Sequence, residues 1–249
     1  MLRSLVGSEM CIRDRGQTAE NLANEYSISR VSQEEYALQS HNKAIKAKSQ
    51  GSLTNEIVAV NTGSKTITED GCMRETSLEK MALLPPAFVE NGSVTAATSS
   101  PLTDGAVCNL IASEYYANEN SLDCLAEIIS TSVTGVAPEI MGIGPVEASK
   151  KALKRANLSL DEVDVIELNE AFSSQTLAVM KDLNLNSDDE RVNIDGGALA
   201  IGHPLGASGA RILGKAASIL KRTGKEYALA SMCIGGGMGI ATVLRNFES

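Results

Sequence analysis

The sequence predicts an α/β fold in which helices cover the faces of a layered sheet. The main observation is that strand and helix patterns alternate along residues 122–249. Short apolar runs rich in β-branched residues are typical of buried strands, and the segments between them have helical spacing. Such an alternation favours a largely parallel sheet. Two glycine-rich turns in the same half of the chain carry a histidine and a cysteine, so we expect a functional site there.

The chain opens with a segment that does not look like the start of a native domain. Residues 1–15 have mixed charge and no apolar run long enough for a secretory signal, so we set them apart as a leader. From Gly16 the pattern becomes regular, and a helix is expected to open near Thr18.

A second helix is expected from Ser32, because Ser32 and Glu35 have the spacing of a capping box. It should run to about Gln50, with Gly51 as its end. Residues 51–100 are punctuated by Pro-Pro and Asn-Gly, which indicates short strands and turns.

The remaining elements follow from apolar runs and helix signals. A buried strand is expected at 106–112 and a linker at 116–121. Further strands are expected at 125–131, 163–168, 227–233 and 239–244, and helices at 144–156, 171–183 and 206–221.

Composition excludes several classes of function. The chain has 249 residues, 43% of them hydrophobic, which is sufficient for a sizeable core. A net charge of −9 argues against nucleic acid or an anionic membrane as the main partner, because both need a basic surface. The five cysteines show no CxxC spacing and there are only two histidines, so neither a disulfide framework nor a metal centre is expected. A reducing, intracellular environment fits these cysteines best.

His203 and Cys233 are the main candidates for chemistry. His203 lies between Gly202 and Pro204, beside an expected helix start, where an imidazole can act as a base or donate to a carbonyl oxygen. Cys233 ends an apolar strand and meets three glycines, whose backbone N–H groups can stabilise an oxyanion. The alternatives are a structural histidine and a small apolar core residue. Cys108 and Cys124 look like packing residues.

Two other features have a structural interpretation beside the functional one, and a third has a structural one alone. Asn169 follows a strand directly, where α/β folds place site residues, but it could equally cap the next helix. The segment 209–216 nearly fits a phosphate-binding P-loop, yet Ala216 replaces the required hydroxyl and the pattern is helical. We interpret it as a helix face of small residues. His41 lies in a polar helix and is expected to be structural.

Several spaced motifs together resemble the thiolases, that is, 3-ketoacyl-CoA thiolase and acetyl-CoA acetyltransferase. The motifs are NEAF at 169–172, GGALAIGHPLGASGAR at 196–211 and CIGGG at 233–237. Supporting matches are TAENLA at 18–23, LTDGA at 102–106 and GPVEASKKAL at 144–153. The resemblance runs from Gly16 to the C-terminus. It implies a layered α-β-α-β-α fold.

The resemblance also implies roles for individual residues. His203 would be the base and a carbonyl-oxygen donor, and Cys233 would be the second acid/base. Gly235 would offer an oxyanion amide, and Asn169 would hold a water that completes the other oxyanion site. Four further residues would line the channel for the pantetheine arm: Phe88, Ser100, Ala171 and Phe172.

The chain departs from the family in one respect. The family's nucleophilic cysteine has Cys-Gly/Ser-Ser-Gly neighbours, and no cysteine here has them, including Cys11 in the leader. We therefore expect residues 16–121 to be a loop domain with the last part of the N-terminal domain, 122–249 to be a complete C-terminal domain, and most of the N-terminal domain to be missing. Such a fragment should lack acyl transfer.

The implied reaction is thiolytic cleavage of a 3-ketoacyl-CoA to acetyl-CoA and a shortened acyl-CoA, or the reverse Claisen condensation. Coenzyme A would be a substrate, with no cofactor and no metal. The resemblance implies a homodimer or tetramer at full length and leaves room for a partner subunit in fatty-acid β-oxidation, with no nucleic acid and no membrane span. We expect a cytoplasmic location, and a mitochondrial one stays open. Two alternatives are a non-catalytic module that binds or assembles around CoA esters and, less favoured, a ketoacyl synthase.

Overall fold

The computed structural model describes residues 8–247, with side chains described from residue 15 onward. Its centre is a four-stranded sheet with the strand order β3-β6-β5-β4. The strands are β3 (Ala126–Gly135), β4 (Val165–Leu168), β5 (Tyr227–Ile234) and β6 (Met238–Asn246). Every residue of β4 is buried, as expected of a strand covered on both faces.

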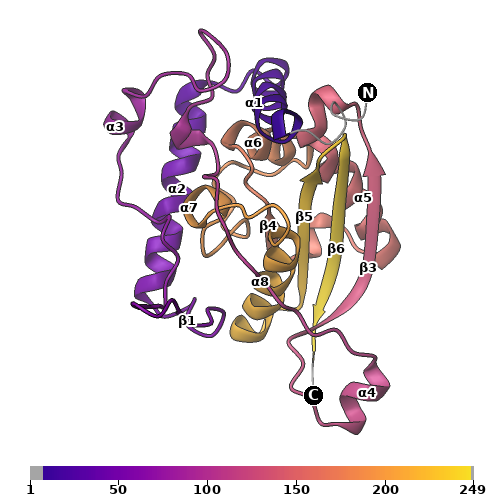
Figure 1. The fold of residues 1–249 in the computed structure, drawn as a ribbon. Helices are drawn as coiled ribbons and strands as arrows, with labels where there is room; N and C mark the ends of the chain where they lie inside the picture. Colours follow the sequence, from indigo (N-terminus) through magenta and orange to yellow (C-terminus); the bar gives the residue numbers. More distant parts are fainter. Residues whose placement is uncertain (1–7, 248–249) are drawn as a thin grey trace.

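Helices cover both faces of this sheet (Figure 1). On one face, α5 (Gly144–Ala156) packs against β3 and β6, and on the other α8 (Ser208–Thr223) packs against β4 and β5. Helix α6 (Ser173–Asp182) lies beside α5 and belongs to the same core cluster. The α/β class and the layered arrangement are confirmed.

The N-terminal elements pack around α6 and the loop after β4 (Figure 1). Helix α1 (Ser8–Glu25) contacts α6, and α2 (Arg30–Ser49) contacts both α6 and the short α7 (Ala198–Ile201). The other elements are small. They are the ribbon of β1 (Val60–Asn61) and β2 (Thr66–Ile67), α3 (Leu78–Ala82), α4 (Glu114–Glu119), and 3-10 turns at Ala96–Thr98, Pro138–Ile143 and Leu160–Glu162.

The expected largely parallel sheet is wrong. Only β4 and β5 run parallel, whereas β6 pairs antiparallel with both β5 and β3. The reason lies in the turn between β5 and β6, where Gly236 (φ +86°) and Gly237 (φ +89°) adopt the left-handed backbone that a tight hairpin needs. A connection of three glycines is far too short for the crossover that joins parallel strands.

The expected buried strand at 106–112 is also absent. The segment is extended, but no strand within the described residues lies beside it, so it forms no sheet. Its large apolar side chains are therefore exposed, with Leu110 84% and Ile111 68% accessible. Cys108 is exposed and Cys124 half-buried, which corrects their assignment as packing residues. An apolar pattern predicts a strand's character, whereas burial requires a neighbouring strand or helix.

Several element boundaries differ from expectation. Helix α1 begins at Ser8, ten residues before Thr18, so part of the expected leader is helical. The N-cap of α2 is Ser29, whose hydroxyl accepts a hydrogen bond from the Ser32 amide, and no capping box forms at Ser32. Part of the expected linker is α4. Among the described residues, no helix is both long and apolar enough to cross a bilayer.

Candidate active site

The carboxyl ends of β4 and β5 bring Asn169 and Cys233 to the same edge of the sheet. Leu168 pairs in register with Ser231, and the Asn169 amide donates to the Ser231 carbonyl at 3.0 Å. Asn169 is 1% exposed and Cys233 6% exposed. Helix α6 begins at Ser173 with Phe172 as its N-cap, so Asn169 does not cap the helix. A functional role for Asn169 stays a prediction.

His203 reaches this edge on the loop between α7 and α8. Gly202 before it has a φ of +101°, a conformation that favours glycine, and a Cβ there would lie 2.6 Å from the Thr103 hydroxyl. That hydroxyl accepts a hydrogen bond from the His203 amide at 2.8 Å. The segment around Thr103 therefore fixes the backbone of the histidine loop.

The His203 ring is buried and contacted at both nitrogens. Its Nδ1 lies 2.6 Å from the Ser208 hydroxyl, and its Nε2 lies 3.4 Å from Asn169 Nδ2. Burial, with the positive charges of Arg15 and Arg211 as lesser causes, lowers the pKa of His203 to about 4. The imidazole is therefore neutral at pH 7 and can accept a proton.

Cys233 lies in a small buried cluster with Ala171 and Phe172, against which Phe88 packs. Burial raises the pKa of the Cys233 thiol above its ordinary value, so the thiol is protonated at neutral pH. A protonated, buried thiol is suited to donate a proton rather than to attack as a thiolate.

The four residues expected to line a channel also converge. The rings of Phe88 and Phe172 meet edge to face, with centroids 5.7 Å apart. The Ser100 amide donates to the Ala171 carbonyl at 3.1 Å, which holds the segment 99–100 beside the start of α6. Gly235 lies two residues beyond Cys233, is exposed, and has no atom within 4 Å of where a Cβ would stand. A ligand can therefore approach its backbone.

Sequence reasoning missed the groups that support this edge. Ser208, which contacts the His203 ring, looks like an ordinary small residue at a helix start; its spacing of five from the histidine is the one available signal. Glu170 enters the sequence analysis only as the second residue of the NEAF motif. Its buried carboxylate accepts hydrogen bonds from Tyr36, Ser40, Asn193 and the Leu199 amide. This network joins α2 and the 193–199 loop to the residue after Asn169.

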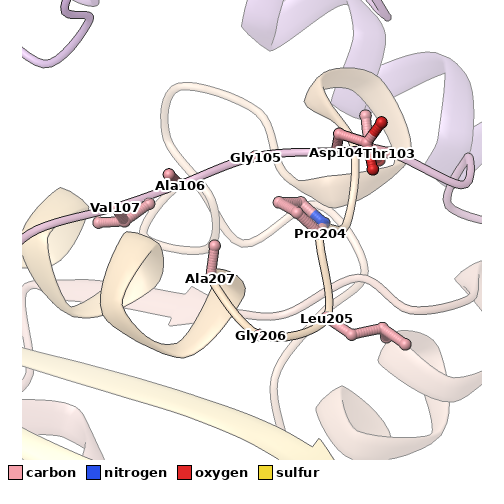
Figure 2. A pocket seen from close by; sticks show the side chains of 9 residues that line it. All are labelled: Thr103, Asp104, Gly105, Ala106, Val107, Pro204, Leu205, Gly206 and Ala207. Carbon is pink, nitrogen blue, oxygen red and sulfur yellow. The ribbon is translucent and has the colours of Figure 1, made fainter.

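A hollow of about 360 Å³ lies beside the turn that follows His203 (Figure 2). The extended segment Thr103–Val107 passes over the turn Pro204–Ala207, with the Pro204 ring facing Gly105. His203 and Cys233 do not line this hollow. Within the part of the chain that the structure describes, no group of three or more His, Cys, Asp or Glu side chains could hold a metal ion.

Two protein-family models match this chain. The model of the thiolase C-terminal domain matches residues 122–246, and that of the thiolase N-terminal domain matches residues 8–115. The chain belongs to the thiolase family. The N-terminal match reaches into the expected leader and continues to residue 115. The expectation that the N-terminal domain is largely missing is therefore partly wrong.

Individual relatives are similar along most of this chain. A 3-ketoacyl-CoA thiolase of Aliivibrio fischeri is 50% identical over 92% of the chain, and a probable acetyl-CoA acyltransferase of Staphylococcus epidermidis is 46% identical over 94%. The chain spans only 61% and 60% of those two proteins. The crystal structure of human mitochondrial 3-ketoacyl-CoA thiolase in complex with CoA is 43% identical, with a TM-score of 0.90 over 93% of this chain and 58% of that one.

Proposed function

We propose that this chain carries most of the active site of a thiolase-type acyltransferase. The reaction is thiolytic cleavage of a 3-ketoacyl-CoA to acetyl-CoA and a shortened acyl-CoA, or the reverse condensation. The observation that carries the proposal is the contact between a neutral histidine and Asn169, with Nε2 and Nδ2 3.4 Å apart, at the sheet edge that also carries a buried, protonated cysteine. The names of the two bacterial relatives agree with this reaction.

His203 is the base that takes the proton of a nucleophilic thiol. The lowered pKa keeps its imidazole neutral, and Asn169 contacts the nitrogen that would accept the proton. The thiolate then attacks the 3-keto carbon of the substrate, and the bond between C2 and C3 breaks. The electron pair stays on C2 of the leaving acetyl-CoA as an enolate.

Cys233 gives its proton to that C2 carbanion, which yields acetyl-CoA. Its raised pKa keeps the proton available until negative charge develops nearby. The Gly235 amide is the oxyanion donor beside Cys233, since the open space around it admits the thioester carbonyl. On the histidine side, Asn169 would hold the water that completes the second oxyanion site. Coenzyme A, arriving as the second substrate, gives its thiol proton to the Cys233 thiolate and takes the acyl group from the nucleophile. The nucleophile leaves as a thiolate and regains its proton from His203.

Phe88, Ser100, Ala171 and Phe172 form the wall of the channel for the pantetheine arm. The edge-to-face pair of aromatic rings and the hydrogen bond between Ser100 and Ala171 fix this wall beside Cys233. We further propose CoA and acyl-CoA as the ligands, without a metal or cofactor. A homodimer or tetramer, a β-oxidation partner subunit and a cytoplasmic location belong to the same proposal.

The nucleophile comes from a segment that this sequence does not contain. Of the four cysteines whose side chains are described, only Cys233 is buried at the site, and its proposed role is that of the acid. The Cys11 side chain lies outside the described part of the chain, and its sequence neighbours are unlike those of the family's nucleophile. We therefore expect the printed chain alone to show no exchange of labelled CoA with acetyl-CoA.

The test uses an extended protein, defined as this chain preceded by a thiolase N-terminal segment that carries the nucleophilic cysteine. Replacement of the base, His203→Ala, should slow acyl-enzyme formation by about 100- to 10,000-fold, the usual range for general base catalysis. The other histidine provides the matched control, and His41→Gln should leave this rate unchanged. Acylation is followed by rapid quenching and intact-protein mass spectrometry. An unchanged rate in His203→Ala would contradict the proposal.

A further inference from the structure

The imidazole of His203 lies between two polar side chains, and each of its nitrogens contacts a different one. Ser208 Oγ is 2.6 Å from Nδ1, and Asn169 Nδ2 is 3.4 Å from Nε2. All three side chains are buried, with Ser208 wholly inaccessible. A neutral imidazole carries one ring proton, so the two contacts together decide which nitrogen has it.

The hydroxyl of Ser208 has a second partner in the Pro204 carbonyl, 3.1 Å away at the start of α8. A hydroxyl has one proton to donate, and a carbonyl oxygen can only accept. Donation to Pro204 leaves a lone pair of Ser208 Oγ facing Nδ1, which then must carry the ring proton. The other nitrogen, Nε2, keeps a bare lone pair and accepts from the Asn169 amide group.

We propose that Ser208 is a positioning residue that holds His203 in the tautomer with the proton on Nδ1, so that Nε2 is unprotonated and can accept a proton in exchange for its hydrogen bond from Asn169. The catalytic importance of this tautomer rests on the proposed function, because a base needs an unprotonated nitrogen directed at the site. The tautomer itself, the position of one proton, is independent of any activity.

Asn169 explains why the hydroxyl of Ser208 is needed. Its Oδ1 is buried and accepts no hydrogen bond within the described residues. If the hydroxyl were removed, a half-turn of the amide would present Oδ1 to Nε2, and a proton on Nε2 would satisfy both atoms. That tautomer, which histidine also prefers in water, cannot accept a proton at Nε2. The loss of one oxygen atom would thus convert the base into a donor.

The tautomer can be measured directly on the printed chain. Because the chain has only two histidines, a long-range ¹H–¹⁵N spectrum of protein labelled in its imidazole nitrogens contains just two ring patterns. The variant His203→Asn removes one pattern and so assigns it. At pH 7 we expect the wild-type His203 pattern to be that of the neutral ring protonated at Nδ1.

Two variants complete the experiment. In Ser208→Ala we expect the His203 pattern to change to that of the Nε2-protonated ring, while the His41 pattern stays in place and reports that the fold is intact. Ser218→Ala makes the same replacement on the same helix, where the serine contacts Glu56, and should leave the His203 pattern unchanged.

A wild-type ring protonated at Nε2, or a Ser208→Ala ring that keeps its proton on Nδ1, would overturn the inference. The wild-type spectrum decides the first point even if Ser208→Ala fails to fold. Failure of the proposed function would look different, since the acylation assay could show no role for His203 while the tautomer result stands.

Discussion

Buried titratable side chains give this protein an unusual response to acid at the residue scale. Both histidines are buried, and burial lowers the pKa of each from the ordinary value of 6.5 to about 4. Between these two pH values the unfolded chain binds a proton on each histidine and the folded chain does not. The free energy of unfolding must therefore fall as the pH falls through this window.

The variant His41→Gln tests this response, because glutamine has no proton to gain. Denaturant titrations at several pH values between 4 and 6.5 should show a smaller loss of stability in His41→Gln than in the wild type. The carboxylates titrate in both proteins, so their effect cancels in the comparison. An equal pH dependence in the two proteins would contradict the burial of His41 as a neutral ring.

The two proposed reacting groups of the site could be selected from the sequence, but the residues that contact His203 could not. His203 and Cys233 stood out because each is a reactive side chain in a glycine-rich turn. Ser208 and Thr103 are common polar residues, and only the folded chain brings them to the ring and the amide of His203. Thr103 is 100 residues away in sequence, so no local pattern reports its contact.

At the scale of elements, the boundaries of α5 agree with the sequence pattern because strong local signals mark them. Pro145 lies in the first turn of α5, and Asn157 ends the helix in the left-handed conformation. The predicted strand direction is wrong, because the alternation of strands and helices favours parallel strands, whereas the three glycines between β5 and β6 form a hairpin. The length of the connection between two strands indicates whether they run parallel or antiparallel, and the three-glycine connection can be seen in the sequence.

The extended segment 105–112 has an apolar sequence but is largely exposed to solvent. It is apolar along its length, yet Leu110 and Ile111 face solvent. A hydrogen bond from Asn109 Nδ2 to the Ala210 carbonyl attaches it to α8. An exposed, extended and apolar segment with unpaired backbone groups is a template for association with other chains.

We therefore expect the double variant Leu110→Lys/Ile111→Lys to reduce self-association of the printed chain. Both side chains are exposed, so the free energy of unfolding should change by less than about 0.5 kcal/mol. Light scattering against protein concentration measures association, and denaturant titration measures stability. Asn118→Lys with Asn120→Lys adds the same charge on and beside α4 and serves as the control. Association that falls equally in both double variants would assign the effect to net charge alone.

At the scale of the whole molecule, contacts distant in sequence hold the two matched regions together. Lys215 of α8 is 2% exposed at its side chain and pairs with both Glu56 and Asp195. The Glu170 network likewise joins α2 to the end of β4. These charged groups place the N-terminal residues against the C-terminal sheet. The proposed channel wall at Phe88 and Ser100 thereby lies against the edge that carries Cys233.

The central claim is that this edge of the sheet is a thiolase-type site in which Cys233 acts as the acid/base and not as the nucleophile. The reaction has two steps, acylation of the nucleophile and cleavage of the bond between C2 and C3, and an assay of overall turnover alone would not distinguish them. Acylation of the nucleophile from an acyl-CoA thioester needs His203, whereas making or breaking the bond between C2 and C3 also needs the Cys233 proton.

The most direct measurement is the mass of the extended protein carrying Cys233→Ala after incubation with acetyl-CoA, together with its rate of acetoacetyl-CoA cleavage. We predict that this variant gains one acetyl group while its cleavage rate falls by at least about 100-fold. Cys108→Ala, which removes an exposed thiol, should keep both properties of the parent. Full cleavage activity in Cys233→Ala, or the loss of acetylation together with cleavage, would contradict the account.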